Sequence, residues 1–214
     1  MSVKRTVETA PVVHVVEDDE SSRVASSRLL RAAGYDVRLY ATGDAFLAET
    51  PTGAGCIVLD LRLPGQSGLD LQEQLTKATN SLPIVFLTGH GDVPQSVRAM
   101  KAGAVDFLTK PVAAPVLLDA VARAIVRDAE RRSVQSRQLA LYDRYHRLTP
   151  REREVFAHLI SGQLNKQIGF DLGISERTVK VHRHQVLEKM GVDSIAELVR
   201  VAADLKIESV GKVR

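Results

Sequence analysis

The sequence predicts a doubly wound, parallel, five-stranded α/β domain, followed by an all-α domain of four helices with a helix-turn-helix. Three observations lead to this prediction. Residues 11–130 alternate short apolar runs with amphipathic stretches, as parallel sheets covered on both faces do. Residues 148–208 carry consecutive helix signals around a glycine-containing turn. The charge balance changes sign between the two regions, which indicates two domains with different partners.

The length and composition suit two globular domains. The chain has 214 residues, of which 44% are hydrophobic and 26% are charged, and this mixture argues against a disordered chain. Residues 1–130 contain 13 Lys and Arg against 16 Asp and Glu, whereas residues 131–214 contain 16 against 10, so the basic part suits a polyanion. No apolar run approaches the ~18 residues of a membrane span. Cys56 is the single cysteine, so we expect a cytoplasmic protein without a membrane partner.

Five apolar runs are the predicted strands of the first domain, at 11–16, 36–40, 56–60, 83–88 and 104–109. The predicted helices lie near 21–33, 43–49, 68–78, 93–102 and 113–130. Gly34 follows the first helix in the position of a C-cap glycine. Connections between parallel strands are right-handed, so this alternation places helices on both faces of the sheet.

A charged segment separates the two domains. Residues 128–147 carry many charges and contain neither glycine nor proline, which predicts a solvated helical linker. The first domain is therefore expected to cover residues 11–127 and the second residues 148–208.

The second domain begins with a strong helix start signal. Thr149 is a candidate N-cap, Pro150 fits the first helical position, and Glu152 completes a capping box. Apolar residues follow at helical spacing, and Gly162 ends the helix.

A short helix over 165–172 leads to Gly173 and then to a long helix with Ser175 as its N-cap, which is the pattern of a helix-turn-helix. One side of the long helix is predicted to be a core stripe of Val179, His182, Val186 and Met190. The opposite side carries cationic and apolar residues suited to the DNA major groove, namely Arg177, Lys180, Val181 and His184.

Chemically active side chains follow four of the predicted strands. Glu17 and Asp18 follow the first strand, Asp60 the third, Thr88 the fourth and Lys110 the fifth. Function in such sheets gathers outside the carboxyl ends of the strands. Carboxylate oxygens around an open position suit Mg²⁺. Asp60 is then placed to accept a phosphoryl group that Lys110 and Thr88 contact.

The four consecutive acids Glu17, Asp18, Asp19 and Glu20 have two readings. They either form a solvated helix start or surround a cation, because a buried carboxylate is costly unless it is neutralised. The sequence pattern alone leaves both readings open.

The segments "VVEDDE", "IVLDLRLPGQSGLD", "IVFLTGHGDV" and "AVDFLTKP" resemble the receiver domain of two-component response regulators. The resemblance implies that Asp18 and Asp60 bind Mg²⁺ directly, that Glu17 acts mostly through water, and that the carbonyl of Arg62 completes the protein ligands. Asp19 and Glu20 would belong to the loop and the first helical turn.

The same resemblance implies a conformational switch. Thr88 and Phe107 match the switch pair of the family, in which phosphate on Asp60 draws the threonine inward and the aromatic ring follows. Ordinary core packing is the alternative for Phe107. The resemblance also implies a cis peptide between Lys110 and Pro111.

The segments "LTPRERE", "NKQIGFDLGIS" and "RTVKVHRHQVLEKMG" resemble the LuxR/NarL-type DNA-binding domain, and residues 11–205 as a whole are similar to FixJ-type response regulators of the NarL/FixJ family. The resemblance implies that Lys180, Val181 and His184 enter the groove. It places four further residues near the DNA backbone, namely Lys166, Arg177, Thr178 and Arg183. Residues 194–205 would be a fourth helix and a dimer contact.

The leading hypothesis is a transcription factor that a sensor histidine kinase phosphorylates on Asp60, with Mg²⁺ as cofactor. Phosphorylation would promote a homodimer that binds double-stranded promoter DNA, and contact with RNA polymerase is a further expectation. We expect no enzyme activity beyond self-phosphorylation and dephosphorylation. The alternatives are a phosphohydrolase, which lacks a second acid where Arg62 stands, and a DNA-binding regulator that acts independently of phosphorylation.

Overall fold

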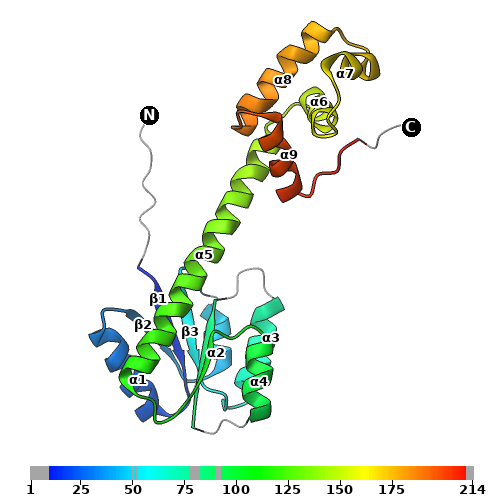
Figure 1. Ribbon diagram of the computed structural model, residues 1–214. Coiled ribbons are helices and arrows are strands. Elements are labelled where there is room, and N and C mark those ends of the chain that lie inside the picture. The colour runs from blue at the N-terminus through cyan, green and yellow to red at the C-terminus, as the bar shows by residue number, and fades with distance from the viewer. Residues whose placement is uncertain (1–9, 50, 52, 78–81, 90–92, 211–214) are drawn as a thin grey trace. The chain divides into compact units, whose positions relative to one another are not determined.

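The structure is a computed structural model that describes residues 10–49, 51, 53–77, 82–89 and 93–210 (Figure 1). The chain forms two compact units that divide between Arg131 and Arg132. Within the described part of the chain, no helix is both long enough and apolar enough to cross a membrane.

The first unit is built on a five-stranded sheet in which every strand is parallel to its neighbours, in the order β2-β1-β3-β4-β5. The strands are β1 Val12–Val16, β2 Asp36–Tyr40, β3 Gly55–Leu59, β4 Ile84–Thr88 and β5 Asp106–Thr109. The helices are α1 Glu20–Ala32, α2 Gly43–Glu49, α3 Gly68–Lys77, α4 Val93–Lys101 and α5 Ala114–His146. The predicted doubly wound fold is confirmed. Residue 78, the predicted end of the third helix, lies outside the described residues.

The two faces of the sheet carry separate apolar cores, because successive strand residues point to opposite faces. On one face, Phe86 of β4 packs with Phe46 of α2 and Leu71 of α3. On the other face, Val85 packs with Leu30 of α1 and with α5. Strands β3 and β4 are buried along their whole length, which explains their unbroken apolar sequences.

Helix α1 begins directly after the acidic run. Asp19 is its N-cap and accepts a hydrogen bond from the backbone N–H of Ser22 at 2.7 Å, and Glu20 is its first residue. Both side chains are exposed, so the solvated helix-start reading is confirmed for these two acids. Gly34 follows the end of the helix with φ +91°, a conformation that glycine adopts without strain.

Helix α5 continues through the segment predicted as a linker, residues 128–147, as far as His146. The Asp128 side chain is buried in the first unit, where it accepts a hydrogen bond from the backbone N–H of Gly55 at 3.0 Å. Leu141, Tyr142 and Tyr145 pack against the core of the second unit. The segment is therefore helical but not solvated throughout, and the proposed domain bounds stay a prediction.

The second unit contains α6 Pro150–Ile160, α7 Asn165–Leu172, α8 Glu176–Met190 and α9 Ile195–Asp204 around one apolar core. The predicted capping box is confirmed, since Glu152 N–H donates to Thr149 Oγ1 at 3.3 Å and Thr149 N–H donates to Glu152 Oε2 at 2.7 Å. Ser175 caps α8, and Gly173 ends α7 in the left-handed conformation with φ +64°. This turn joins α7 to α8 as the helix-turn-helix pattern predicts.

Candidate functional site

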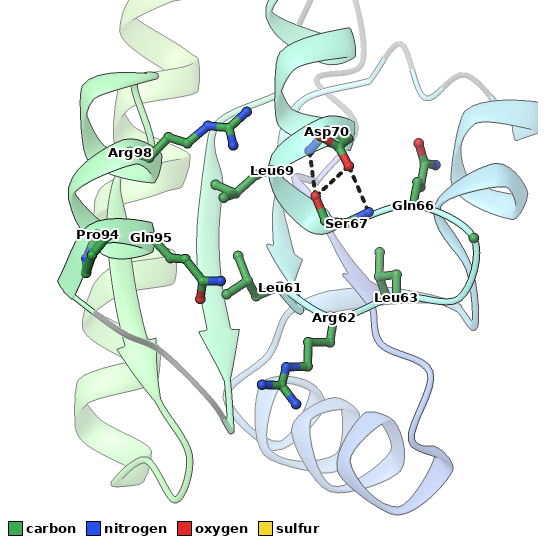
Figure 2. Close-up of a pocket in the computed structure, with 11 residues that line it drawn as sticks. Leu61, Arg62, Leu63, Gln66, Ser67, Leu69, Asp70, Pro94, Gln95 and Arg98 are labelled. Carbon is green, nitrogen blue, oxygen red and sulfur yellow. Dashed lines mark hydrogen bonds between the residues drawn. The ribbon is translucent and has the colours of Figure 1, made fainter.

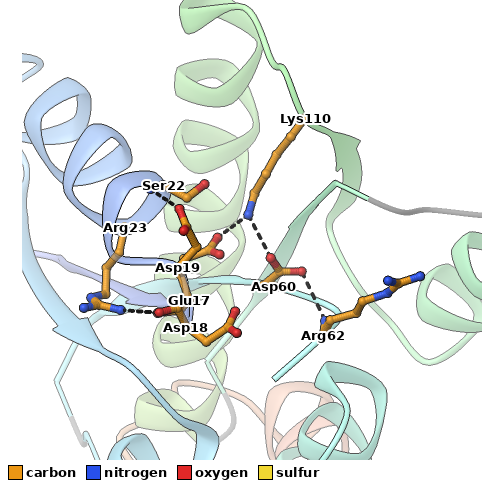
Figure 3. A network of polar contacts seen from close by, with 8 residues as sticks. All are labelled: Glu17, Asp18, Asp19, Ser22, Arg23, Asp60, Arg62 and Lys110. Carbon is orange, nitrogen blue, oxygen red and sulfur yellow. Dashed lines mark hydrogen bonds and ion pairs between the residues drawn. The ribbon is translucent and has the colours of Figure 1, made fainter. Parts of the chain in front are cut away.

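The fold brings three of the predicted site residues to one edge of the sheet (Figure 3). Glu17 follows β1, Asp60 follows β3 and Lys110 follows β5, and the order of the strands reverses beside β1 and β3. The backbone fixes these positions, because Asp60 N–H donates to Val16 O at 2.9 Å and Lys110 N–H donates to Thr88 O at 2.8 Å. The predicted cis peptide precedes Pro111.

Lys110 joins the two buried acids. Its Nζ donates to Asp60 Oδ2 at 2.8 Å and makes an ion pair with Glu17. The backbone N–H of Arg62 donates to the other oxygen of Asp60, Oδ1, at 3.1 Å. The Asp60 carboxylate is therefore held from both sides by donors, in a fixed orientation.

The environment separates the pKa values of the two acids. Burial raises the pKa of Glu17 to about 7, more than its hydrogen bond with Lys110 lowers it. Burial opposes ionisation of Asp60 as well, but the hydrogen bonds from Lys110 and from the Arg62 N–H outweigh burial and lower the pKa of Asp60 below its ordinary value. Burial would likewise lower the pKa of Lys110, yet Asp60 and Glu17 hold it above the ordinary value. Near neutral pH, Asp60 is thus an anion beside a cation.

The acids at this edge also form a set of metal ligands. Glu17, Asp18 and Asp60 each offer a carboxylate oxygen, and these oxygens lie within 4.8 Å of one another. Asp18 is exposed, and its carboxylate has no hydrogen bond or ion pair with the residues that the structure describes. Hard oxygen donors with access to solvent fit Mg²⁺, which keeps several waters when it binds protein. The predicted role of the Arg62 carbonyl stays a prediction.

The predicted switch pair lies on one face of the sheet. Thr88 is buried at the end of β4 and pairs in register with Thr109, and Phe107 lies two residues before Thr109 on β5. Because side chains two apart on a strand share a face, Thr88 and Phe107 point to the same side. Phe107 is half-buried, and its ring centroid lies 5.8 Å from that of Phe86. This geometry is compatible with a switch and also with core packing.

A pocket of about 720 Å³ lies beside the site, between the loop that follows Asp60 and helix α4 (Figure 2). Its apolar part is lined by Leu61, Leu63, Leu69 and Pro94, and Arg98 reaches it from α4. Ser67 Oγ donates to Asp70 Oδ2 at 2.7 Å, which fixes the start of α3 on the wall of the pocket. No sequence pattern predicts this pocket, since its walls are separate segments of mixed polarity.

The predicted DNA-reading side of α8 is exposed in the second unit. Arg177, Lys180, Val181 and His184 are all exposed. Lys180 Nζ lies 3.3 Å from Glu176 Oε1 in an exposed i,i+4 pair that DNA phosphates can replace at small cost. The four side chains are therefore available to a ligand.

The remaining predicted contacts differ in exposure. Lys166 is exposed on α7, whereas Thr178 and Arg183 are half-buried. Thr178 Oγ1 lies 2.8 Å from Ser175 Oγ, and Arg183 Nη1 donates to Asn165 Oδ1 at 3.3 Å. In the core stripe, Val179, Val186 and Met190 are buried as predicted, while His182 is half-buried and its Nδ1 finds no hydrogen-bond partner in the described chain.

Comparison with known proteins decides the family. The model of the response regulator receiver domain matches residues 13–122, which is more than half of the chain, and the model of the luxR family of bacterial regulatory proteins matches residues 146–202. The chain belongs to the two-component response regulators. The predicted resemblance is confirmed.

Full-length relatives share both domains with this response regulator. It is 43% identical to the response regulator protein TodT of Pseudomonas putida over 92% of this chain and 87% of that protein. It is 40% identical to the transcriptional regulatory protein FixJ of Rhizobium meliloti over 89% of this chain and 94% of that protein. The solved structure of the response regulator StyR, with 46% identity and a TM-score of 0.82, matches 91% of this chain and 99% of that chain.

The family settles the general function. A receiver domain joined to a LuxR-type domain makes this chain a transcription-regulating response regulator, which implies a cognate sensor kinase and binding to DNA. Response regulators of this architecture are regulators and not conventional enzymes, so the phosphohydrolase alternative is not supported.

Proposed function

We propose that a sensor histidine kinase phosphorylates this response regulator on Asp60, and that the phosphorylated form dimerises and binds promoter DNA. The observation that carries the proposal is the placement of Asp60. Its carboxylate is anionic, is oriented by Lys110 and by the Arg62 N–H, and lies within 4.8 Å of the Glu17 and Asp18 carboxylates.

The chemistry follows from these contacts. An oxygen of Asp60 attacks phosphorus, the bond from phosphorus to the donor nitrogen breaks, and the imidazole of the kinase keeps the electron pair. Lys110 stabilises charge on the transferred phosphoryl oxygens, as a preoriented ammonium does. Glu17, Asp18 and Asp60 would hold Mg²⁺, which supplies positive charge that offsets charge on the same oxygens.

The proposed response to phosphorylation involves the buried Thr88, the half-buried Phe107 and the exposed face of α8. A phosphoryl group on Asp60 adds acceptor oxygens at the end of β3, near the end of β4 where the Thr88 hydroxyl is buried. Movement of Thr88 vacates space on the face that Phe107 shares. We infer that this change promotes a homodimer, whose two copies of Lys180, Val181 and His184 would read half-sites of DNA.

The test is labelling with a radioactive acyl phosphate in the presence of Mg²⁺. Asp60→Asn is expected to abolish labelling, whereas Asp70→Asn, which changes an exposed carboxylate of the same domain, should retain it. Labelling of the Asp60→Asn protein at the wild-type level contradicts the role of Asp60.

The second part of the proposal is tested with beryllofluoride as the phosphate mimic. Molecular mass and DNA affinity are measured with and without beryllofluoride and Mg²⁺, and both are expected to rise with the mimic. DNA affinity that falls with salt but ignores the mimic would favour the regulator that acts independently of phosphorylation.

A further inference from the structure

Arg23 contacts the backbone of the two residues that lead the acidic run. Its Nη1 donates to the carbonyl oxygen of Glu17 at 2.7 Å and to the carbonyl oxygen of Asp18 at 3.0 Å (Figure 3). Arg23 lies in the first turns of α1 and is half-buried. The contact therefore ties a rigid helix to the peptide units that carry two of the three clustered carboxylates.

The acidic run is held at both ends by other bonds. Glu17 N–H donates to Tyr40 O at 3.0 Å, and the Asp19 side chain caps α1. Between these two anchors, rotation of the peptide units at Glu17 and Asp18 would turn both side chains away from Asp60. A charged donor on both carbonyls opposes that rotation, because charge-assisted hydrogen bonds are stronger than neutral ones.

We propose that Arg23 is a positioning residue for the divalent cation, fixing the backbone that aims Glu17 and Asp18 at Asp60. This inference rests on the proposed function, since it takes the three carboxylates to be the cation site. Groups that orient metal ligands typically contribute about 10- to 100-fold to metal affinity. Arg23 reaches the ligands through the backbone, so the lower end of that range, about 10-fold, is expected.

The charge of Arg23 alone would have the opposite effect. A guanidinium near a divalent cation repels it, so removal of the charge without any loss of positioning would tighten binding. A neutral substitution of Arg23 should therefore weaken Mg²⁺ binding if the residue positions the ligands, and tighten it if only the charge matters. The two roles also differ for lysine, which keeps the charge but lacks the planar fork of donors.

The experiment is calorimetric titration of the full-length protein with MgCl₂. Arg23→Met is expected to weaken Mg²⁺ binding about 10-fold, and Arg23→Lys is expected to weaken it by a smaller factor. Arg28→Met is the matched control, because Arg28 is an exposed arginine of the same helix and makes no contact with the acidic run among the residues that the structure describes. The Mg²⁺ affinity of this variant should stay within about twofold of the wild type. Asp18→Asn should lose binding.

Labelling kinetics separate positioning from general structural support. In Arg23→Met, the Mg²⁺ concentration for half-maximal labelling by acyl phosphate should rise about 10-fold, and in Arg23→Lys it should rise by a smaller factor. The rate at saturating Mg²⁺ should stay within about twofold of the wild type in both variants. A loss of thermal stability with unchanged Mg²⁺ affinity overturns the inference, and so does tighter binding in Arg23→Met. Failure of the wild type to bind Mg²⁺ overturns the proposed function as well, whereas normal wild-type binding with unaffected variants overturns the role of Arg23 alone.

Discussion

Replacement of Gly68 by alanine is expected to destabilise the receiver domain and to slow phosphorylation. Gly68 is the buried first residue of α3, and its N–H donates to Leu61 O at 2.8 Å. A Cβ at this position would lie 2.3 Å from the carbonyl oxygen of Asp60 and 3.1 Å from both Leu61 Cα and Phe86 Cε1. The start of α3 and the residues that follow β3 are therefore too close for any side chain at this position.

Two effects of opposite sign determine how much Gly68→Ala changes the free energy of unfolding. Alanine gains up to about 1 kcal/mol over glycine from reduced unfolded-state entropy and from helix propensity. Overpacking costs about 1 to 3 kcal/mol or more. The upper end applies here, because the Asp60 oxygen and the Leu61 Cα are backbone atoms and cannot rotate away. The free energy of unfolding is expected to fall by about 2 kcal/mol in total.

Differential scanning calorimetry of the full-length protein measures this loss, since it can separate the transitions of two domains. A loss of about 2 kcal/mol should lower the unfolding midpoint of the receiver by about 6 to 12 °C. Because the displaced oxygen belongs to Asp60, labelling by acyl phosphate should slow as well. Gly53→Ala is the control, since Gly53 is exposed and a Cβ there meets nothing within 4 Å. An unchanged midpoint in Gly68→Ala would refute the reasoning.

Three further predictions concern buried polar groups. Burial lowers the pKa of His14 from 6.5 to about 4, so the unfolded chain binds the proton more tightly and the free energy of unfolding should fall as pH drops from about 6.5 to about 4. The expected loss is about 2 to 3 kcal/mol, measured by urea unfolding as the difference from His14→Gln. In Lys189→Met, the buried Glu152 carboxylate loses the ammonium group that lies 2.7 Å from both of its oxygens. The free energy of unfolding of the second unit should fall by about 1 to 2 kcal/mol, measured by calorimetry. The double variant with Glu152→Gln should recover much of this loss, because no buried carboxylate is then left unpaired. Asp128→Ala removes the acceptor of a buried β3 N–H and should lower the receiver midpoint by several degrees, whereas Asp119→Ala, at an exposed position, should not.

Much of the fold could be predicted because each element leaves a local trace. The strand predicted at 56–60 is β3, Gly55–Leu59, because a strand buried on both faces must be apolar throughout. The capping residues Thr149 and Ser175 predicted two helix starts correctly, since a cap needs a particular side chain at one position. The packing of the linker segment could not be predicted in this way. The charged sequence around Asp128 predicts a solvated side chain, but one of its partners is a backbone N–H 73 residues away.

The candidate site likewise contains residues that a sequence pattern predicts and one that no pattern predicts. Glu17, Asp18, Asp60 and Lys110 could be placed together, because each follows a strand of one parallel sheet. Arg23 could not be found from a pattern, since arginine on a helix is ordinary and its acceptors are carbonyls that every residue carries. Contacts to backbone depend on the path of the chain in space, which periodicity and motif spacing do not specify.

The charges at the site indicate what the cluster of acids is suited to bind. Two carboxylates whose oxygens are about 5 Å apart repel each other by about 3 kcal/mol at an effective dielectric constant of about 20. Lys110 supplies a single positive charge against the three carboxylates of Glu17, Asp18 and Asp60. Burial raises the pKa of Glu17 to about 7, and the charge of Asp60 raises it further. A divalent cation beside Lys110 would balance all three carboxylates. The cluster is costly in the protein alone and becomes favourable once further positive charge is bound, which is the property that a phosphoacceptor site requires.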